Sequence, residues 1–466
     1  MKNIRFYLVA LSLFLVGAVS AQQTSGGISQ DMLNQIKKSY EGTATDKALR
    51  NIINKNDISL LVQNADRANT IDTYFSNKVE SKGISNQRSS GRCWLFCGLN
   101  VLRSKAIAKH NLGDFQFSQD YVFFYDQLEK ANLFLQGIID TREKLLNDQT
   151  VVWLLKNPIG DGGQFTGIAD LLTKYGVVPA DVMPETNSSN NTRGMSSVIA
   201  LKLKEQALQL RDMSAAGKKL SDLEKSKTEM LGTIYRILVL NLGEPPTSFT
   251  WSRKDDKGKT IETKTYTPKQ FFDEYVGDDL KHNYVMLMND PSRDFYKLYE
   301  VEYDRHVYDG ENWTYVNLPI EDIKAMAISS IKDSTSMYFS CDVGKFLDRT
   351  RGYLELGAEE YAPLFGTTFN MNKKQRIQTF SSGSSHAICL MAVDLDEKGQ
   401  PKKWMVENSW GPGANNGHLI MTDDWFNEYM FRLVVNKKYI TDKVREIMKQ
   451  TPIKLPPWDP MFAEED

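Results

Sequence analysis

The stretch 386–394 constrains the fold more than any other part of the chain, because it is short and nearly all apolar. An apolar run of this length after a small-residue segment is typical of a strand that is buried on both faces. Residues 403–408 follow after a glycine-containing loop, which predicts a hairpin, and 417–421 predict a further strand. The last third of the chain is therefore expected to be rich in strands.

The preceding part of the chain has helical periodicity. The segment 93–110 carries Leu95, Leu99 and Leu102 on one expected buried face, and 119–146 forms a second helical region. The predicted fold class is α+β. The predicted divisions are a signal peptide (1–21), an N-terminal arm (22–70), a helical lobe (71–185), an inserted helical region (186–330), a β-rich lobe (331–453) and a C-terminal tail (454–466).

The first residues resemble an export signal. Lys2 and Arg5 precede the apolar run 6–19, and small residues end at Ala21. The alternative is a membrane anchor, but the run is shorter than the roughly 20 residues needed to span a bilayer. We expect a mature chain beginning near Gln22 that is periplasmic or extracellular and not attached to a membrane.

Composition and cysteine usage exclude several classes. The formal net charge is −2 and the sequence pI is about 6.3, which does not indicate nucleic acid or an anionic membrane as a partner. Four cysteines are too few for a disulfide scaffold. Cys97 lies one helical turn after Cys93 without a second Cys/His pair, so we expect a packed side chain and no metal site or cofactor. Cys341 and Cys389 are expected in strands, and a disulfide between them is left open.

Three residues together indicate nucleophilic chemistry. Cys93 lies where a Gly/Ser loop meets a helix start, and unpaired N–H groups and the helix dipole there favour a thiolate. His386 begins the buried strand, and Asn408 ends its expected neighbour. A thiol nucleophile needs an imidazole, and the imidazole needs a third group that orients it. Separately, the three would be interpreted as a packed cysteine, a structural histidine and a turn asparagine.

The motifs around these residues resemble those of papain-like cysteine peptidases. Gln87 precedes Cys93-Trp94 by six residues, and His386-Ala387 and Asn408-Ser409-Trp410-Gly411 match the same superfamily. The interval between Cys93 and His386 is about twice the usual one, which indicates the bleomycin hydrolase and aminopeptidase C branch. Further matches to that branch lie at 90–94, 162–164, 242–247, 341–345, 406–411, 421–426 and 458–461, so the resemblance extends from about 60 to 461.

The resemblance implies a fold and a set of residue roles. The fold would have two lobes, one helical and one an antiparallel β-barrel, with large helical insertions. Cys93 would attack the scissile carbonyl, His386 would transfer protons, and Asn408 would hold the imidazole. The other implied roles are the oxyanion hole for Gln87, a cover over the Asn408–His386 bond for Trp410, and the lining of the cleft for Gly162 and Gly163.

The C-terminal tail bears on the kind of peptidase. Members of the resembled family assemble as hexamers, and their C-terminal carboxylate binds the substrate's amino group; this implies the same role for Asp466. Residues 462–466 depart from the family's small-residue finish and add three acidic side chains. The predicted function is a cysteine aminopeptidase acting on peptides through an acyl-enzyme. The alternatives are an endopeptidase with an open cleft and a non-catalytic peptide-binding oligomer.

Overall fold

The computed structural model describes residues 26–67 and 72–461. The chain divides into two compact units, Met1–Val62 and Gln63–Asp466. The first contains three short helices, which begin after the side-chain caps Ser29, Thr43 and Asp57: α1 (Gln30–Lys38), α2 (Ala44–Ile53) and α3 (Ile58–Leu61). The predicted signal peptide lies outside the described residues.

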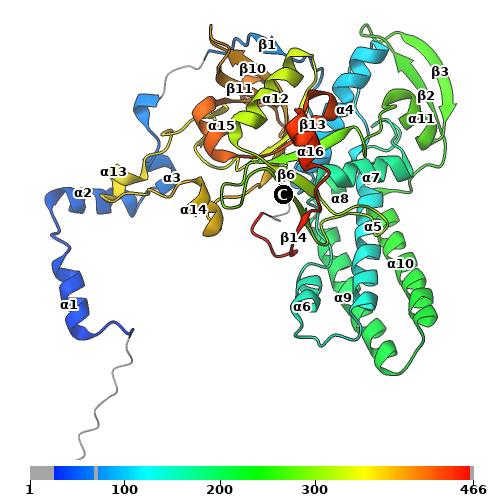
Figure 1. Ribbon diagram of the computed structural model, residues 1–466, viewed down its shortest axis with the longest axis horizontal. Helices are drawn as coiled ribbons and strands as arrows, with labels where there is room; N and C mark the ends of the chain where they lie inside the picture. Colours follow the sequence, from blue (N-terminus) through cyan, green and yellow to red (C-terminus); the bar gives the residue numbers. More distant parts are fainter. Residues whose placement is uncertain (1–25, 68–71, 462–466) are drawn as a thin grey trace, which may run out of the picture. The chain divides into compact units, whose positions relative to one another are not determined.

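The second unit is built on one large sheet, which Figure 1 shows with helices on either side. Its strand order is β14-β5-β6-β4-β13-β7-β10-β11-β12-β9-β8, and β1 pairs with β10. Most pairs are antiparallel, as predicted, but β4–β6, β5–β14 and β9–β12 are parallel. The strands are β1 (Asn77–Lys78), β4 (Tyr284–Met288), β5 (Lys297–Val301), β6 (Thr314–Asn317), β7 (Met337–Cys341), β8 (Leu347–Asp348), β9 (Tyr353–Leu354), β10 (His386–Leu395), β11 (Pro401–Glu407), β12 (His418–Thr422), β13 (Met430–Asn436) and β14 (Ile453–Leu455).

The strand predicted at 386–394 is β10, and its burial has a simple cause. Successive side chains of a strand point to opposite faces. Ala387 and Cys389 belong to one hydrophobic core, while Ile388 and Leu390 belong to another on the other face of the sheet. The predicted hairpin is also present, because β10 pairs antiparallel with β11 and β11 with β12.

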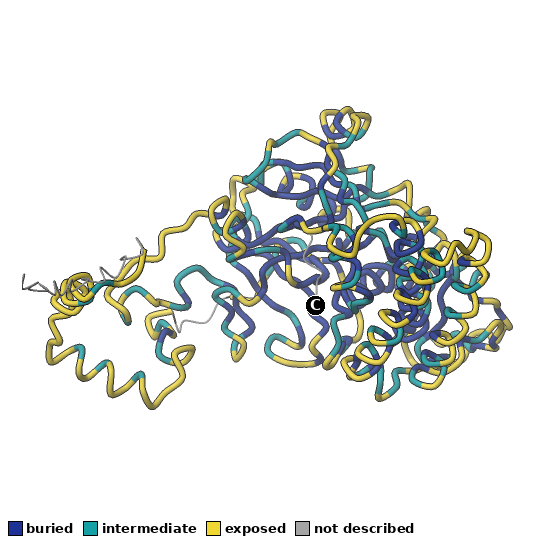
Figure 2. The backbone as a smooth tube through the Cα atoms, turned by 90° about the horizontal axis from the view of Figure 1, so that it is seen from below, coloured by how far each residue is buried: buried dark blue, intermediate teal, exposed yellow. Residues whose placement is uncertain are grey.

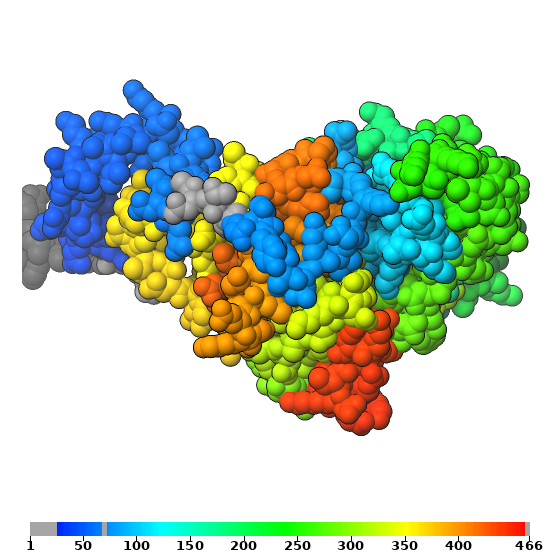
Figure 3. Space-filling view, turned by 90° about the horizontal axis from the view of Figure 1, so that it is seen from above, coloured from blue at the N-terminus to red at the C-terminus, as the bar shows by residue number. Residues whose placement is uncertain are grey.

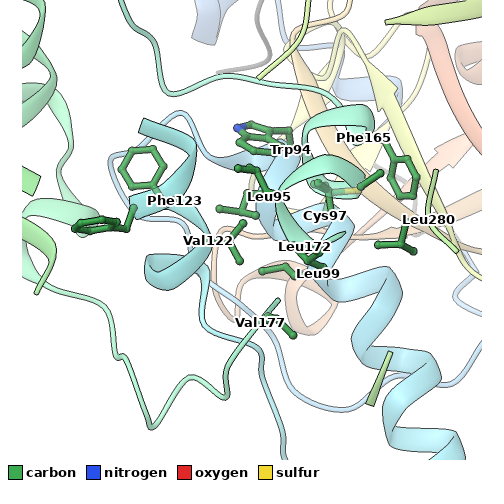
Figure 4. Close-up of a cluster of buried hydrophobic side chains, with 14 of the residues drawn as sticks. Trp94, Leu95, Cys97, Leu99, Val122, Phe123, Phe165, Leu172, Val177 and Leu280 are labelled. Atoms are coloured by element: carbon green, nitrogen blue, oxygen red, sulfur yellow. The ribbon is translucent and has the colours of Figure 1, made fainter. Parts of the chain in front are cut away.

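The first core joins the sheet to α4 (Cys93–His110), which packs against β10. Figure 4 shows Leu95, Cys97 and Leu99 of α4 among side chains from α5 (Gln119–Asp140) and α7 (Phe165–Tyr175). Gly98 lets α4 and α7 approach closely, since a Cβ there would lie 2.0 Å from Ile168 Cδ1. The predicted helical face of 93–110 is confirmed, although nearly the whole helix is buried.

The region predicted as an inserted helical segment contains more than helices. Its long helices α9 (Arg193–Ala215) and α10 (Leu220–Leu242) pack along α5 (Figure 1). A two-stranded hairpin, β2 (Phe249–Lys254) with β3 (Thr260–Tyr266), follows, and Figure 3 shows it in green beside the cyan surface of the early helices. Strands β4, β5 and β6 belong to the main sheet, so the sheet runs across the division predicted at 330. The domain limits themselves stay predictions.

The remaining helical segments pack in several places: α12 (Ile320–Lys332) and α15 (Asp423–Tyr429) lie on the main sheet, whereas α6 (Gln149–Lys156), α8 (Asn187–Asn190) and α11 (Pro268–Tyr275) pack against other helices. Figure 2 shows buried residues concentrated in the sheet and the inner helices, with exposed residues along the outer helices. No helix in the described part of the chain combines the length and hydropathy that crossing a bilayer requires. The other segments are η1 (Ala65–Arg67), α13 (Tyr361–Phe365), α14 (Lys373–Gln378), η2 (Ala414–Gly417), η3 (Lys437–Tyr439) and α16 (Asp442–Ile447).

Candidate active site

Cys93 is the first residue of α4, and its position is fixed by the residue before it. The buried Arg92 guanidinium donates to both carboxylate oxygens of Glu185, at 3.1 and 2.7 Å, and to the Ser189 carbonyl at 2.7 Å. The Arg92 carbonyl accepts from the N–H groups of Leu95 and Phe96, which closes the first turn of the helix. A charge-assisted, bidentate arginine contact therefore anchors the helix start that carries the thiol.

The structure brings His386 and Asn408 together, as the hairpin predicts. His386 Nε2 lies 2.9 Å from Asn408 Oδ1, which also accepts from the Ser409 N–H at 2.8 Å. Because the amide oxygen is the acceptor of both bonds, the proton of the neutral imidazole is assigned to Nε2. Nδ1 is then the basic nitrogen.

Cys93 contacts β10, the strand that carries His386, through its sulfur. The Ala387 N–H, next in sequence to His386, donates to Cys93 Sγ at 3.3 Å. This donor and the α4 N-terminus both place positive potential at the sulfur, an arrangement that favours a thiolate. Cys93, His386 and Asn408 are all buried, which strengthens electrostatic interactions between them.

Gln87 is fixed to the residue that follows Asn408. Ser409 Oγ donates to Gln87 Oε1 at 2.6 Å, and the Gln87 N–H donates to the Ser409 carbonyl at 2.8 Å. One hydrogen of the Gln87 amide goes to the Ser90 carbonyl at 2.8 Å. An amide carries two such hydrogens. The second can serve the oxyanion hole that the family resemblance implies.

Trp410 lies over the imidazole. Its ring centroid is 5.0 Å from that of His386, with 30° between the planes, and the residue is 37% exposed. The exposed part forms the rim of a cavity of about 220 Å³ that also includes Asn408. Trp410 therefore shields His386 and borders open space at once.

Gly162 and Gly163, the pair predicted to line the cleft, lie in a loop that contacts Lys130 and His306. Lys130 Nζ donates to the carbonyls of Gly160 and Gly162 at 3.0 and 2.5 Å. A Cβ at Gly163 would lie 2.3 Å from His306 Cε1 and 2.7 Å from Trp94 Cδ2. The missing side chain thus serves internal packing at Gly163, in addition to the open backbone that the sequence analysis expected.

His306 and Asp126 form a buried pair that the sequence analysis did not identify. His306 Nδ1 donates to Asp126 Oδ1 at 2.5 Å, and its Nε2 accepts from the Gln164 N–H at 3.3 Å. Burial lowers the pKa of His306, in keeping with a neutral ring that accepts at Nε2. Burial opposes ionisation of Asp126, but Lys130 and His306 hold its pKa below the usual value. No local pattern in the sequence indicates this pair, because its two members lie 180 residues apart in the chain.

The C-terminal segment is anchored beside the same loop. Buried Arg432 donates to Gln164 Oε1 at 2.7 Å and to the Met461 carbonyl at 2.6 Å. The Met461 N–H donates to Asp459 Oδ1 at 3.0 Å, and Asp459 is paired with Arg293. The last described residue is therefore held next to the cleft glycines. Asp466 lies outside the described residues.

The other cysteines are packed thiols. None of the four forms a disulfide. Cys97 belongs to the core, as predicted. Cys341 and Cys389 face opposite cores of the sheet, so no bridge joins them, and burial raises the pKa of Cys389 to about 12. Within 26–67 and 72–461 there is no cluster of three or more His, Cys, Asp or Glu side chains suited to a metal ion.

Comparisons with known proteins found relatives that match most of the chain. Aminopeptidase C of Lactobacillus delbrueckii subsp. lactis is 37% identical over 400 residues, covering 84% of this chain and 88% of the relative. Bleomycin hydrolase of Gallus gallus is 39% identical over 395 residues, covering 83% and 87%. The crystal structure of pepw from Lactobacillus rhamnosis hn001 matches with a TM-score of 0.90 at 36% identity, over 95% of this chain and 100% of that one.

These similarities confirm the predicted fold class and the resemblance to aminopeptidase C and bleomycin hydrolase. The model of the Peptidase C1-like family matches residues 27–462, nearly everything that the structure describes. The chain therefore belongs to the Peptidase C1-like family.

Proposed function

We propose that the protein is a papain-like cysteine aminopeptidase that removes residues from the amino terminus of peptides. The observation that carries this is that the start of α4, the start of β10 and the residue after β11 meet at one site. The Ala387 N–H donates to Cys93 Sγ at 3.3 Å, and His386 Nε2 lies 2.9 Å from Asn408 Oδ1. The relatives named aminopeptidase C and bleomycin hydrolase support the same reaction class.

The chemistry follows from the positions of the groups. The Cys93 thiolate attacks the scissile carbonyl carbon, and the oxyanion accepts from the Gln87 side chain and the Cys93 N–H. The His386 imidazolium gives a proton to the leaving nitrogen, so the C–N bond breaks and an acyl-enzyme remains. His386 then takes a proton from water, hydroxide adds to the acyl carbon, and the thiolate leaves. Each oxyanion donor of this kind typically contributes on the order of 100-fold or more in rate.

The preference for the amino terminus of a peptide is proposed to come from the C-terminal segment of the chain. Arg432 holds Met461 beside Gln164, adjacent to the cleft glycines. The chain ends five residues later with Glu464, Glu465 and Asp466. We infer that these carboxylates bind the positively charged amino group of a peptide, an interaction that opposite charge favours. A peptide without that charge would bind poorly.

The test compares one peptide with a free and with an acetylated amino terminus. The reaction is run with a thiol reductant, and its products are identified by mass spectrometry. We expect stepwise loss of amino-terminal residues from the free peptide only. Cys93→Ala is the inactive control. A chain ending at Met461 should begin to cleave the acetylated peptide. Internal cuts by the full chain would instead establish an endopeptidase, and no cleavage at all would favour a peptide-binding protein.

Two further proposals concern assembly and location. By its family resemblance the protein is proposed to form a hexamer. Light scattering on the purified chain measures its oligomeric state directly.

By its first 21 residues the protein is proposed to be exported. Cell fractionation and N-terminal sequencing should give a periplasmic or secreted chain beginning at Gln22, and retention of Met1 would contradict export.

A further inference from the structure

A cationic side chain, Arg349, lies at the rim of the active site and has no acidic partner among the residues that the structure describes. The guanidinium carbon of Arg349 is 5.1 Å from the centroid of the Trp410 ring, on the exposed part of the site. Both residues line the cavity of about 220 Å³ that also includes Asn408 and His418. Among the described residues that line this cavity, none is acidic.

The carboxylates nearest in sequence are already engaged. Asp348 accepts from the Arg351 N–H at 2.9 Å and from Arg351 Nε at 2.6 Å. Glu355 is paired with Arg67 at 2.9 Å. No ion pair of Arg349 is present within the described residues. Its charge is therefore available to a ligand.

The turn that carries Arg349 is held in place. It joins β8 to β9, and the Gly352 N–H donates to the Asp348 carbonyl at 2.8 Å. The Asn415 side chain donates to the Arg351 carbonyl at 2.9 Å, and the Ile420 N–H donates to the Gly352 carbonyl at 3.0 Å. The guanidinium is thus presented from a backbone that is bonded to β12 and to the loop before it.

The reaction itself indicates which part of a substrate passes this point. His386 must give its proton to the leaving nitrogen, so the leaving segment begins beside the imidazole. Trp410 packs on that imidazole at 5.0 Å, and Arg349 lies on Trp410. A leaving segment that follows this surface would pass from His386 over Trp410 to Arg349.

We propose that Arg349 is a specificity-determining residue that binds a carboxylate on the leaving segment of the substrate. This rests on the proposed peptidase function. The carboxylate comes either from an acidic side chain just after the scissile bond or from the free carboxyl terminus of a short peptide. Arginine suits both, because its planar fork matches a carboxylate and its stacking on Trp410 fixes the fork in place.

The test uses substrates that differ only in this charge. Leucyl-glutamyl-glycinamide is compared with leucyl-glutaminyl-glycinamide, and leucyl-glycyl-glycine with its amide. We expect kcat/KM to be about 5- to 10-fold higher for the charged member of at least one pair, mostly through KM, and to decline with added salt. A preference in the first pair identifies the side chain, and one in the second identifies the terminal carboxylate.

Three variants complete the experiment. In Arg349→Gln the ratio within the preferred pair should fall to about 1, and Arg349→Lys should retain part of it because the charge remains. Arg236→Gln, the same change at an exposed site of α10, should keep the wild-type ratio. A ratio near 1 in the wild type, or a ratio unchanged in Arg349→Gln, would overturn the proposal. Failure of the wild type on every peptide would instead overturn the peptidase function.

Discussion

Replacing Arg103 by methionine should destabilise the protein strongly, because it breaks a buried ion pair within the active-site framework. Arg103 lies on α4, the helix that begins with Cys93, and is paired with Glu407, which directly precedes Asn408. Each of the two side chains is only 1% exposed. The pair thus ties the helix of the thiol to the strand end of the asparagine.

The magnitude follows from what the change leaves behind. Without Arg103, Glu407 keeps one polar partner among the described residues, Ser81 Oγ at 2.6 Å, and no ion-pair partner among them. Removing one partner of a buried pair typically costs about 3–5 kcal/mol. Total stabilities of about 5–15 kcal/mol make that a large fraction. Replacing both residues by methionine removes the stranded charge, so the double variant should recover most of the loss.

Urea unfolding followed by tryptophan fluorescence measures these differences. Wild type, Arg103→Met, Glu407→Met and the double variant form a cycle whose coupling energy isolates the pair. Lys449→Met is the matched control, since its ion pair with Glu446 is 70% exposed on both sides and should contribute less than about 1 kcal/mol. An Arg103→Met variant within about 1 kcal/mol of wild type, or a double variant no more stable than the singles, would refute this reasoning.

Three other changes test separate parts of the structure. Burial raises the pKa of Asp120 to about 7, so the folded protein keeps this proton at pH values where the unfolded chain, with a pKa of about 4, has lost it. The free energy of unfolding should therefore fall as the pH rises from about 4 to 7. Urea titrations at several pH values should show a flatter slope for Asp120→Asn. Gly163→Ala should lower the stability of the protein by about 1–3 kcal/mol, because the new Cβ would overlap the His306 ring. Gly194→Ala, which has open space around it, should leave stability unchanged. Equal melting temperatures for the two variants would contradict the packing argument. Arg432→Met should release the C-terminal segment and raise KM for peptides with a free amino terminus more than it lowers kcat, and an unchanged KM would separate the tail from substrate binding.

Much of the candidate site could be predicted from the sequence, because its signals are local. A thiol at a loop-to-helix junction, an apolar run too short for a helix and a glycine-containing loop between two strands are each set by neighbouring residues. They identified α4, β10 and β11 and the residues at their ends. The pairing of His386 with Asn408 then follows from hairpin geometry alone.

The tertiary structure decided the contacts between residues far apart in the chain. His306 meets Asp126, Arg432 meets Met461 and Gln164, and Arg103 meets Glu407 only because separate elements pack around one sheet. In the sequence such charged residues cannot be distinguished from a solvated surface, since burial is a property of the packed core. The parallel pairing of β4 with β6 is likewise long-range and leaves no local pattern. Local sequence thus indicated which residues we propose to react, and packing determined what holds and surrounds them.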